Sequence, residues 1–425
     1  MTGATVTTTS ATPLADHGGG LRGSEPAGQA ARPQLLREMN ELFLLGHIRD
    51  IGSCSRAELA RLSGLSKPTV SLALANLERV GLIREAGQRT GVPGRSALLY
   101  EVRAEAGYVL GLHVGHQYLR VAVSDMTGQV RARSQLRGTA RSTSSRVAEL
   151  VELADSTCAQ AGIERAEVTQ TVLGSPGVYD PRRNAISLAE GMAGWGRPSA
   201  LAQLRDAFGS DLVIENDVDA ATLAEREHGV GLDTSTFVFV WIGTGIGMGL
   251  VIRGNLHRGA HGVAGEIGYM PLLDAGTLES GGSATAVVRA ARQAGLRGPV
   301  SSRRVFEAAA AGDERAAAVV AAEAELVARA LCAVVTIVDP ALIVLGGGVG
   351  QAPGFAAAVT RQLEQIAPVM PDVRVSALGS EAVVHGCLAA GTELAWKQLT
   401  SAIPVTPGPD DDPGHPLPAG APTGA

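Results

Sequence analysis

The chain of 425 residues is poor in cysteine and aromatic side chains, and it has no long apolar run. Its four cysteines are scattered, so neither a disulfide framework nor a cysteine zinc site is expected. No apolar segment approaches the ~20 residues that a transmembrane helix needs. The first 20 residues lack the charged and apolar regions of a secretory signal. These absences argue against a secreted or membrane-spanning protein and favour a cytoplasmic one.

Charge is distributed unevenly along the chain. The net charge is −6, yet residues 34–103 carry 10 basic and 7 acidic side chains, whereas residues 104–425 carry 24 and 33. A chain of this length exceeds one compact core, so two or three domains are expected. A small basic module on an acidic body is typical of a nucleic-acid reader attached to another domain.

The two ends of the chain differ in composition from the rest. Residues 1–33 are rich in threonine, glycine and alanine without periodicity, and residues 403–425 contain seven prolines and a run of aspartates. Neither segment has the apolar side chains to build a core, so both are expected to be disordered. Two folded parts remain between them, residues 34–103 and residues 104–402.

Residues 34–103 have the pattern of a winged helix–turn–helix. A helix is expected over 36–50. Ser55 and Glu58 have the spacing of a capping box, which opens a second helix. Strands over 82–85 and 96–102, joined by a glycine-rich tip, would form the wing.

The third helix of this module is the candidate recognition helix. Ser66 is expected to cap it, and Pro68 falls in its first turn, where a missing N–H costs little. Val70, Leu74 and Leu77 recur with helical spacing and predict one buried stripe. The opposite face is therefore free to meet DNA.

That opposite face and the wing supply the candidate DNA contacts. Thr69 and Asn76 could reach base edges, and Leu72 could pack on a thymine methyl group. Basic side chains at Lys67 and on the wing are interpreted as phosphate or minor-groove contacts that supply affinity. The alternative is a solvated polar face, which would leave an exposed leucine unexplained. The candidate residues are Ser66, Lys67, Thr69, Ser71, Leu72, Asn76, Arg89 and Arg95.

From residue 104 the pattern becomes that of an α/β protein. A glycine turn near residue 115 and another over 243–247 each follow one strand and precede the next. This repetition predicts a duplicated, two-lobed fold with a ligand cleft between the lobes. Alanine-rich helices separate strands predicted at 108–114, 119–124, 168–174, 211–214, 236–242, 248–252 and 341–345.

Polar groups gather in the turns of this second part. The Gly/Thr turn over 243–247 allows backbone N–H groups to approach a polar ligand. Carboxylates and an amide stand at 215–217, at Glu266 and at Glu279. Such acceptors suit the hydroxyls of a polyol, so the pattern indicates a sugar site.

The last ~300 residues resemble the ROK family of repressors, open reading frames and sugar kinases. The resemblance implies an actin-like fold, that is, a duplicated ribonuclease-H-like α/β fold in two lobes, and the winged helix resembles that of the family's repressor branch. The motifs that carry it are G-S-P-G at 174–177, E-N-D-V-D-A at 215–220 for the family's E-N-D-x-N-A, G-T-G-I-G at 243–247, G-A-H-G-V-A-G-E-I-G at 259–268 and the segment 339–348.

The resemblance also implies roles for individual residues. Asn216, Asp217, Glu266 and Glu279 would hydrogen-bond sugar hydroxyls, and Asp217 matches the catalytic base of the kinases. Tyr269 stands where the family has a histidine, which should change the sugar that fits, since a phenol offers one hydroxyl and a larger ring. The alternative is that Asp217 and Glu266 are ordinary polar residues at turns.

The chain departs from the family's kinases in two places. Their first phosphate loop reads D-x-G-G-T-K, whereas residues 113–118 read H-V-G-H-Q-Y, and this loss should severely weaken binding of Mg²⁺ and ATP. His113 and His116 could be read as a metal pair, but no third ligand is evident. The family's zinc ligands, one histidine and three cysteines, are also missing. No metal and no cofactor are therefore expected.

Together these features predict a sugar-responsive transcriptional repressor that is no enzyme. It would bind operator DNA and a carbohydrate or sugar-derivative effector, form a homodimer or homotetramer, and have no membrane partner. Sugar would close the cleft and change operator affinity by a population shift. Two alternatives stay open: an active sugar kinase with a regulatory N-terminal module, and a DNA-binding protein whose sugar fold is purely structural.

Overall fold

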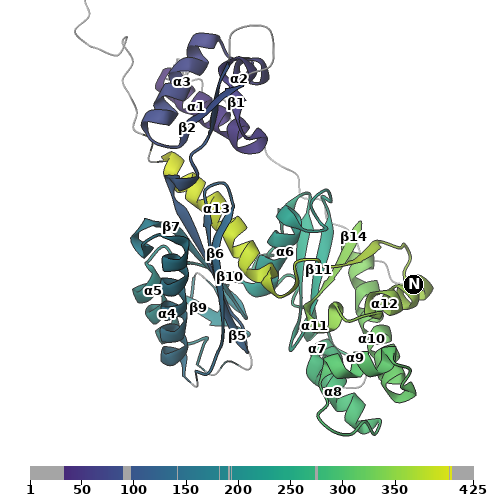
Figure 1. Cartoon of the computed structure of the whole chain (residues 1–425). Coiled ribbons are helices and arrows are strands. Elements are labelled where there is room, and N and C mark those ends of the chain that lie inside the picture. The colour runs from purple at the N-terminus through teal and green to yellow at the C-terminus, as the bar shows by residue number, and fades with distance from the viewer. Residues whose placement is uncertain are drawn as a thin grey trace, which may run out of the picture.

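The N-terminal part of the chain is a winged helix–turn–helix (Figure 1). The computed structural model describes residues 33–401 and 403, apart from positions 90–96, 141, 181, 190, 191, 193 and 273–275. The segments predicted to be disordered, 1–33 and 403–425, lie outside these residues except at two positions: Ile403 is described, and Pro33 begins the first helix, which corrects the predicted boundary there. The elements are α1 (Pro33–Ile51), α2 (Arg56–Ser63) and α3 (Lys67–Arg79), with a sheet in the order β1-β3-β2 formed by β1 (Cys54–Ser55), β2 (Ile83–Arg89) and β3 (Ala97–Val102).

The helices of this module begin where their caps predict. The Ser55 hydroxyl accepts from the Glu58 backbone N–H at 3.3 Å, and the Glu58 carboxylate accepts from the Ser55 backbone N–H at 2.9 Å. Ser66 caps α3, and the stripe of Val70, Leu74 and Leu77 is fully buried. The predicted winged helix–turn–helix is therefore confirmed as a fold.

The rest of the chain consists of two lobes with the same strand order. In each sheet a three-stranded antiparallel meander is followed by two parallel strands, so the order β6-β5-β4-β7-β10 matches β13-β12-β11-β14-β15. This confirms the predicted duplication. The bounds are β4 (Tyr108–Val114), β5 (Tyr118–Asp125), β6 (Val130–Arg137), β7 (Val168–Ser175) and β10 (Val213–Asn216), and then β11 (Phe237–Ile242), β12 (Ile246–Ile252), β13 (Asn255–Leu256), β14 (Leu342–Gly346) and β15 (Asp372–Val375).

Sequence patterns did not predict the strands β6 and β15. β6 carries three arginines and alternates between half-buried and exposed positions, and β15 reads D-V-R-V with one half-buried residue. Both are edge strands, which bury too little apolar surface to leave a hydrophobic run in the sequence. A strand of this kind is recognisable only through its partner.

Two helices lie between the lobes, and further helices cover the outer faces (Figure 1). The helix α6 (Asp217–His228) packs on β11 and β12, while α13 (Ala382–Ser401) crosses α6 and packs on β4 and β7. None of the described helices is long and apolar enough to cross a membrane. The remaining helices are α4 (Thr143–Ala161) and α5 (Pro198–Phe208) in the first lobe, and α7 (Leu278–Gly282), α8 (Ala284–Gln293), α9 (Ser302–Ala310), α10 (Glu314–Val338), α11 (Gly347–Gly350) and α12 (Phe355–Ile366) in the second.

The helix α13 also joins the lobes to the winged helix. The Trp396 indole N–H donates to the Met126 carbonyl at 3.2 Å, and the Arg49 guanidinium of α1 lies 4.9 Å from the centroid of the same indole. Arg49 also forms an ion pair with Glu393 of α13. Buried side chains of α13 and of the winged helix belong to one apolar cluster. The winged helix therefore packs directly on the two-lobed body.

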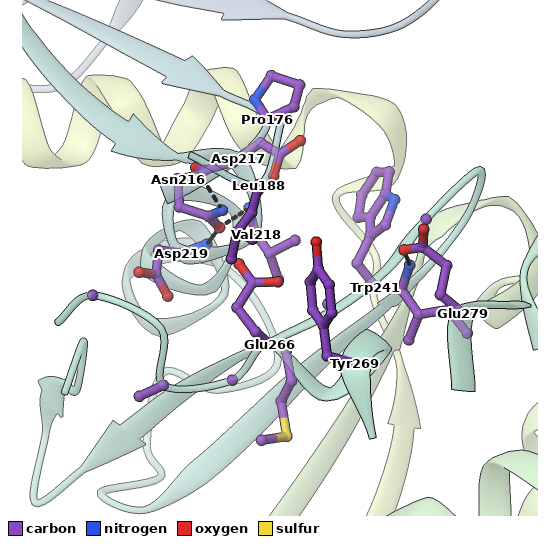
Figure 2. Close-up of a pocket in the computed structure, with 18 of the residues that line it drawn as sticks. Pro176, Leu188, Asn216, Asp217, Val218, Asp219, Trp241, Glu266, Tyr269 and Glu279 are labelled. Atoms are coloured by element: carbon purple, nitrogen blue, oxygen red, sulfur yellow. Dashed lines mark hydrogen bonds between the residues drawn. The ribbon is translucent and has the colours of Figure 1, made fainter. Parts of the chain in front are cut away.

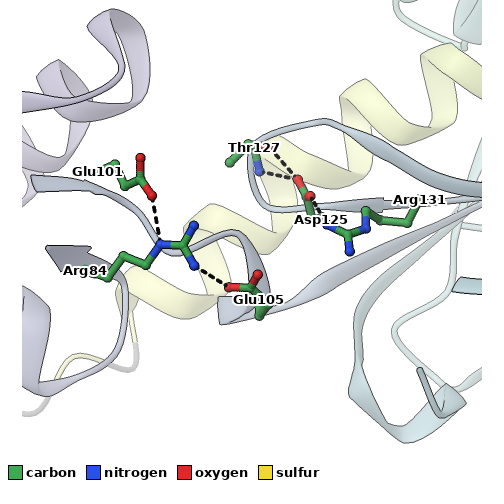
Figure 3. Close-up of polar contacts among 6 residues, drawn as sticks. All are labelled: Arg84, Glu101, Glu105, Asp125, Thr127 and Arg131. Carbon is green, nitrogen blue, oxygen red and sulfur yellow. Dashed lines mark hydrogen bonds and ion pairs between the residues drawn. The ribbon is translucent and has the colours of Figure 1, made fainter. Parts of the chain in front are cut away.

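A second polar junction lies where the wing enters the first lobe (Figure 3). The Arg84 guanidinium of β2 contacts Glu101 at 2.8 Å and Glu105, just after the wing, at 3.4 Å. On the body side, the buried Asp125 carboxylate accepts from the Thr127 hydroxyl at 2.6 Å and from Arg131 at 3.4 Å. These contacts order the two turns at the junction.

The crossing of α6 and α13 gives a prediction about stability. A Cβ atom at Gly386 would lie 1.6 Å from the backbone oxygen of Ala220, whereas one at Gly46, in α1, meets nothing within 4 Å. Gly386→Ala should therefore lower the free energy of unfolding by about 1–3 kcal/mol or more. The same change at Gly46 should raise it by about 0.5–1 kcal/mol. Thermal denaturation followed by circular dichroism compares the two, and an unchanged midpoint for Gly386→Ala would contradict the close packing described.

Candidate functional site

A cavity of about 310 Å³ opens where the two lobes meet (Figure 2). The first lobe contributes the turn after β7 and His116, the start of α6 contributes four consecutive residues, and the second lobe contributes the turn after β11. All five residues predicted to bind sugar line this cavity, namely Asn216, Asp217, Glu266, Tyr269 and Glu279. The structure thus brings together side chains that lie up to 63 positions apart in the sequence.

Asn216 holds the start of α6 against the first lobe. Parallel pairing of β7 with β10 aligns Ser175 with Asn216, which places the turn after β7 beside this residue. The Asn216 side-chain oxygen accepts from the N–H groups of Val218 and Asp219 at 2.8 and 3.0 Å, and its amide donates to the Gly177 carbonyl at 3.1 Å. Most of its hydrogen-bonding capacity is therefore used within the protein, and it orients its neighbours.

Asp217 stands at the first position of α6 and faces the cavity. One of its oxygens accepts from the Val218 backbone N–H at 2.9 Å. Burial raises the pKa of its carboxyl to about 7, and the nearby Glu266 adds to this, although the backbone N–H opposes it. Near neutral pH this carboxyl is therefore poised to accept or to give up a proton.

The second lobe supplies two further carboxylates and a phenol. Glu279 accepts from the Ile246 backbone N–H at 3.0 Å, which ties α7 to the Gly/Thr turn. Glu266 follows Gly265, whose φ of +94° and close approach to the Met248 backbone oxygen permit no side chain. Burial, with Glu279 nearby, raises the pKa of Glu266. The Tyr269 ring stands between these carboxylates in the view of Figure 2.

Asp219 lines the same cavity and was missed by the sequence reasoning. It is 5% exposed, and no described residue donates a hydrogen bond to its carboxylate. Burial and then Glu215 raise its pKa to about 8, while Arg258, which is paired with Glu215 at 3.0 Å, lowers it. The sequence signal for it was one departure from the family motif E-N-D-x-N-A, which has asparagine where this chain has Asp219.

Other lining residues left no sequence signal of their own. Trp241 is the second-last residue of β11 and lines the cavity. Leu188 lines it from the loop after β9 (Ala185–Ser187), a strand that pairs with β8 (Val178–Asp180). From the sequence alone, a tryptophan near the end of an apolar strand is interpreted as a core residue. A leucine in a loop is interpreted as a surface residue. Only the tertiary structure assigns them to the cleft.

The loop at the kinases' first phosphate position does not fit Mg²⁺ or ATP. His113, where the kinases have aspartate, is 6% exposed, and burial followed by the Arg120 charge lowers its pKa to about 3. A buried neutral imidazole beside an arginine is a poor site for a hard cation, which prefers oxygen ligands. The Gly115 N–H donates to the Tyr118 carbonyl at 2.9 Å and closes a tight hairpin instead of an open phosphate loop.

Neither zinc nor another metal fits the described side chains. The segment from Tyr269 to Glu279 contains no cysteine and no histidine. Within the described part of the chain, no group of three or more His, Cys, Asp or Glu side chains could hold a metal ion. His113 and His116 therefore do not form part of a recognisable metal centre among these residues.

The candidate DNA-reading residues fall into two groups on α3. Ser66, Lys67 and Leu72 are exposed, with Leu72 59% exposed, and Ser71 is half-buried. The Ser66 hydroxyl caps the helix and lies 2.8 Å from the hydroxyl of Thr69. The first turn and a half of α3 therefore presents an accessible face.

Asn76 lies apart from this face. Its amide donates to Glu41 of α1 at 2.8 Å, and its carbonyl accepts from Arg79 at 2.6 Å. Its role in base recognition stays a prediction, although these contacts occupy both ends of its amide. Arg89 ends β2 with its backbone paired to Ala97, and Arg95 lies outside the described residues.

The fold and the cleft define a class of protein: a winged helix joined to a two-lobed, actin-like α/β body of the sugar-kinase type. The sequence model of the ROK family matches residues 109–390, and the chain belongs to the ROK family. This confirms the resemblance that its motifs indicated.

Relatives of both kinds, regulators and kinases, are similar to this chain. A xylose repressor of Caldicellulosiruptor bescii is 23% identical over 385 residues, 84% of this chain and 96% of the relative. A solved ROK family transcriptional regulator, described as a homolog of the E. coli MLC protein, shares the fold with a TM-score of 0.70 at 23% identity, over 86% of this chain and 100% of that one. The structure of a ROK hexokinase from Thermus thermophilus has a TM-score of 0.59 and is 30% identical, over 68% of this chain and 99% of that one. Other curated relatives match over 34% to 64% of their own length.

The raised pKa of Asp219 gives a prediction about pH and stability. A carboxyl with a pKa of about 8 in the folded chain and near 4 when unfolded binds more protons when folded between these values. The contribution of protonated Asp219 to the free energy of unfolding is therefore fully present below pH 4, and it is lost as the pH rises toward 8. Asp219→Asn, which cannot ionise, should raise the free energy of unfolding by about 1–3 kcal/mol at pH 8 and by much less at pH 5.

Chemical denaturation of both proteins at pH 5 and pH 8 measures this difference. Asp233→Asn provides the control, because Asp233 is exposed in the second lobe and outside the cavity. A stability gain for Asp219→Asn that is equal at the two pH values would contradict the assignment of a buried, protonated carboxyl.

Proposed function

We propose that this protein is a sugar-responsive transcriptional repressor. The observation that carries the proposal is one chain in which a winged helix with an accessible recognition helix packs on a two-lobed body with a polar interlobe cleft. Its similarity to a xylose repressor along 84% of the chain supports the same function. Operator DNA and a carbohydrate are then its two ligands, and it acts in the cytoplasm as a homodimer or homotetramer.

The helix α13 provides a physical route between the two ligands. Its first half crosses α6, which carries Asp217 and Asp219 at the cleft, and its second half contacts Arg49 of the winged helix. A sugar that draws the lobes together would shift α13 against α6 and so move the DNA-reading heads. Because the coupling is reciprocal, DNA should change sugar affinity by the same factor by which sugar changes DNA affinity.

The chain contains two lysines, which allow a matched test of DNA binding. Lys67 lies exposed at the start of α3, and Lys397 lies exposed on α13. Lys67→Ala should weaken binding to operator and unrelated DNA about equally and lower the slope of log affinity against log salt by roughly one unit, if it neutralises one phosphate. Lys397→Ala should leave both unchanged. Fluorescence anisotropy on DNA flanking the gene measures this, and equal salt slopes for Lys67→Ala and wild type would count against the phosphate contact.

Sugar sensing is expected to depend on Asp217 and Glu266. A hydrogen bond between a carboxylate and a ligand hydroxyl contributes about 1.5–3 kcal/mol. Asp217→Asn and Glu266→Gln should therefore weaken sugar binding by roughly 10- to 100-fold and abolish the effect of sugar on operator binding, while operator binding without sugar survives. Calorimetry across common sugars measures the affinities, with the exposed Asp233→Asn as control. Unchanged affinities in both variants would place the sensor elsewhere.

The alternative function is an active sugar kinase, and the similarity to a ROK hexokinase supports this alternative. The loop at 113–118 weighs against it, because a buried neutral His113 replaces the metal-binding carboxylate. We therefore expect no ADP release from ATP with common sugars above background. Turnover of ~1–100 s⁻¹ in a coupled assay, the range of ordinary kinases, would establish the kinase instead.

A further inference from the structure

The charges around the cavity are strongly one-sided. Four carboxylates line it, those of Asp217, Asp219, Glu266 and Glu279. The described lining residues include no lysine or arginine, and burial lowers the pKa of the one histidine among them, His116. An anionic ligand such as a sugar phosphate is disfavoured here, because it would meet acidic side chains and no cationic one among the described lining residues.

Two of these carboxylates lack a hydrogen-bond donor among the described residues. Asp217 and Glu279 each accept from a backbone N–H, whereas Asp219 and Glu266 do not accept from any described group. Both side chains lie to the left of Tyr269 in Figure 2, and the charge of Glu266 contributes to the raised pKa of Asp219. Asp219 is 5% exposed and lines the cavity, so a ligand there can reach a largely buried carboxyl that has no donor among the described residues.

The nearby arginine does not supply the missing partner. Arg258 binds Glu215 through two of its nitrogens, one of them at 3.0 Å, so its fork is occupied by another carboxylate. A metal ion is not the partner either, since the described side chains include no group able to hold one. A ligand in the cavity can therefore supply the donor that no described side chain provides.

We propose that the effector is an amino sugar whose protonated amine is received by Asp219 and Glu266. An ammonium group carries three N–H donors and one positive charge, which matches two neighbouring carboxylates without donors of their own. Its charge favours the ionised form of both groups, so Asp219, which is protonated in the free protein at pH 6.5, would release its proton on binding. Trp241 and Tyr269 line the same cavity and suit the apolar faces of a sugar ring. This inference rests on the proposed function, because it names the class of sugar that the same cleft selects.

Matched sugars test the inference directly. Calorimetry on the full chain at pH 6.5 would compare glucose with glucosamine, mannose with mannosamine and galactose with galactosamine, together with the N-acetylated form of each, which lacks the charge. In at least one set the free amine should bind about tenfold or more tightly than both neutral sugars.

Variants then assign that preference to particular side chains. D219N restores the asparagine of the family motif. It should lower the affinity for the amino sugar about tenfold or more, so that the amino sugar and its parent sugar bind with similar affinity. E266Q should do the same if D219N fails to fold, as judged by circular dichroism. D233N, exposed and outside the cavity, should keep the preference of the wild type.

The outcomes separate the two proposals. If the neutral sugars bind the wild type as tightly as the amines, or if D219N and E266Q both keep the preference, the inference is wrong and the proposed sugar sensor stands. If no sugar of any set binds, the proposed sugar sensing fails and the inference falls with it. An amine preference that both variants lose supports the two together.

Discussion

The crossing of α6 and α13 is the contact that joins the interlobe cavity to the winged helix. At Gly386 the two backbones approach so closely that a single methyl group on α13 would overlap the Ala220 carbonyl. The carbonyl belongs to the helix whose first turn carries Asn216 to Asp219, and the glycine belongs to the helix that ends against the winged helix. Close packing of this kind makes a crossing respond by discrete shifts, since packed interfaces deform poorly. In the proposed mechanism, a change at the cleft would therefore move α13 as a rigid rod.

The cleft itself is built at a cost to the free protein. Burying Asp217, Asp219 and Glu266 beside one another raises all three pKa values, which means that the empty cavity disfavours their charged forms. A ligand with several donors offsets that cost when it binds, so the unfavourable electrostatics of the free state become selectivity for the bound one. The same reasoning explains why an acidic or phosphorylated sugar is a poor candidate for this site.

The first phosphate position illustrates how the same fold serves a different chemistry. In a kinase this loop must hold a metal and the charge of ATP, whereas here its first side chain, His113, is buried and neutral beside Arg120. The residues predicted to bind sugar, which come from other elements, all line the cavity. Sugar binding and phosphoryl transfer rest on different elements of the fold, so the proposed repressor would keep the first without the second.

The sequence by itself determined those features that depend on neighbouring residues. The capping box at Ser55, the buried stripe of α3 and the glycine turns are local patterns, because a helix start or a tight turn is satisfied by groups a few positions away. The motifs around Asp217 and Glu266 then indicated which segments share a cleft. Only the tertiary structure decided the edge strands β6 and β15, the contact of Asn76 with Glu41, and the exposed and buried faces at the cavity. The role of Asp219 is of this second kind: its burial, its missing donor and its neighbour Glu266 come from elements far apart in the chain, and long-range packing leaves no local pattern to read.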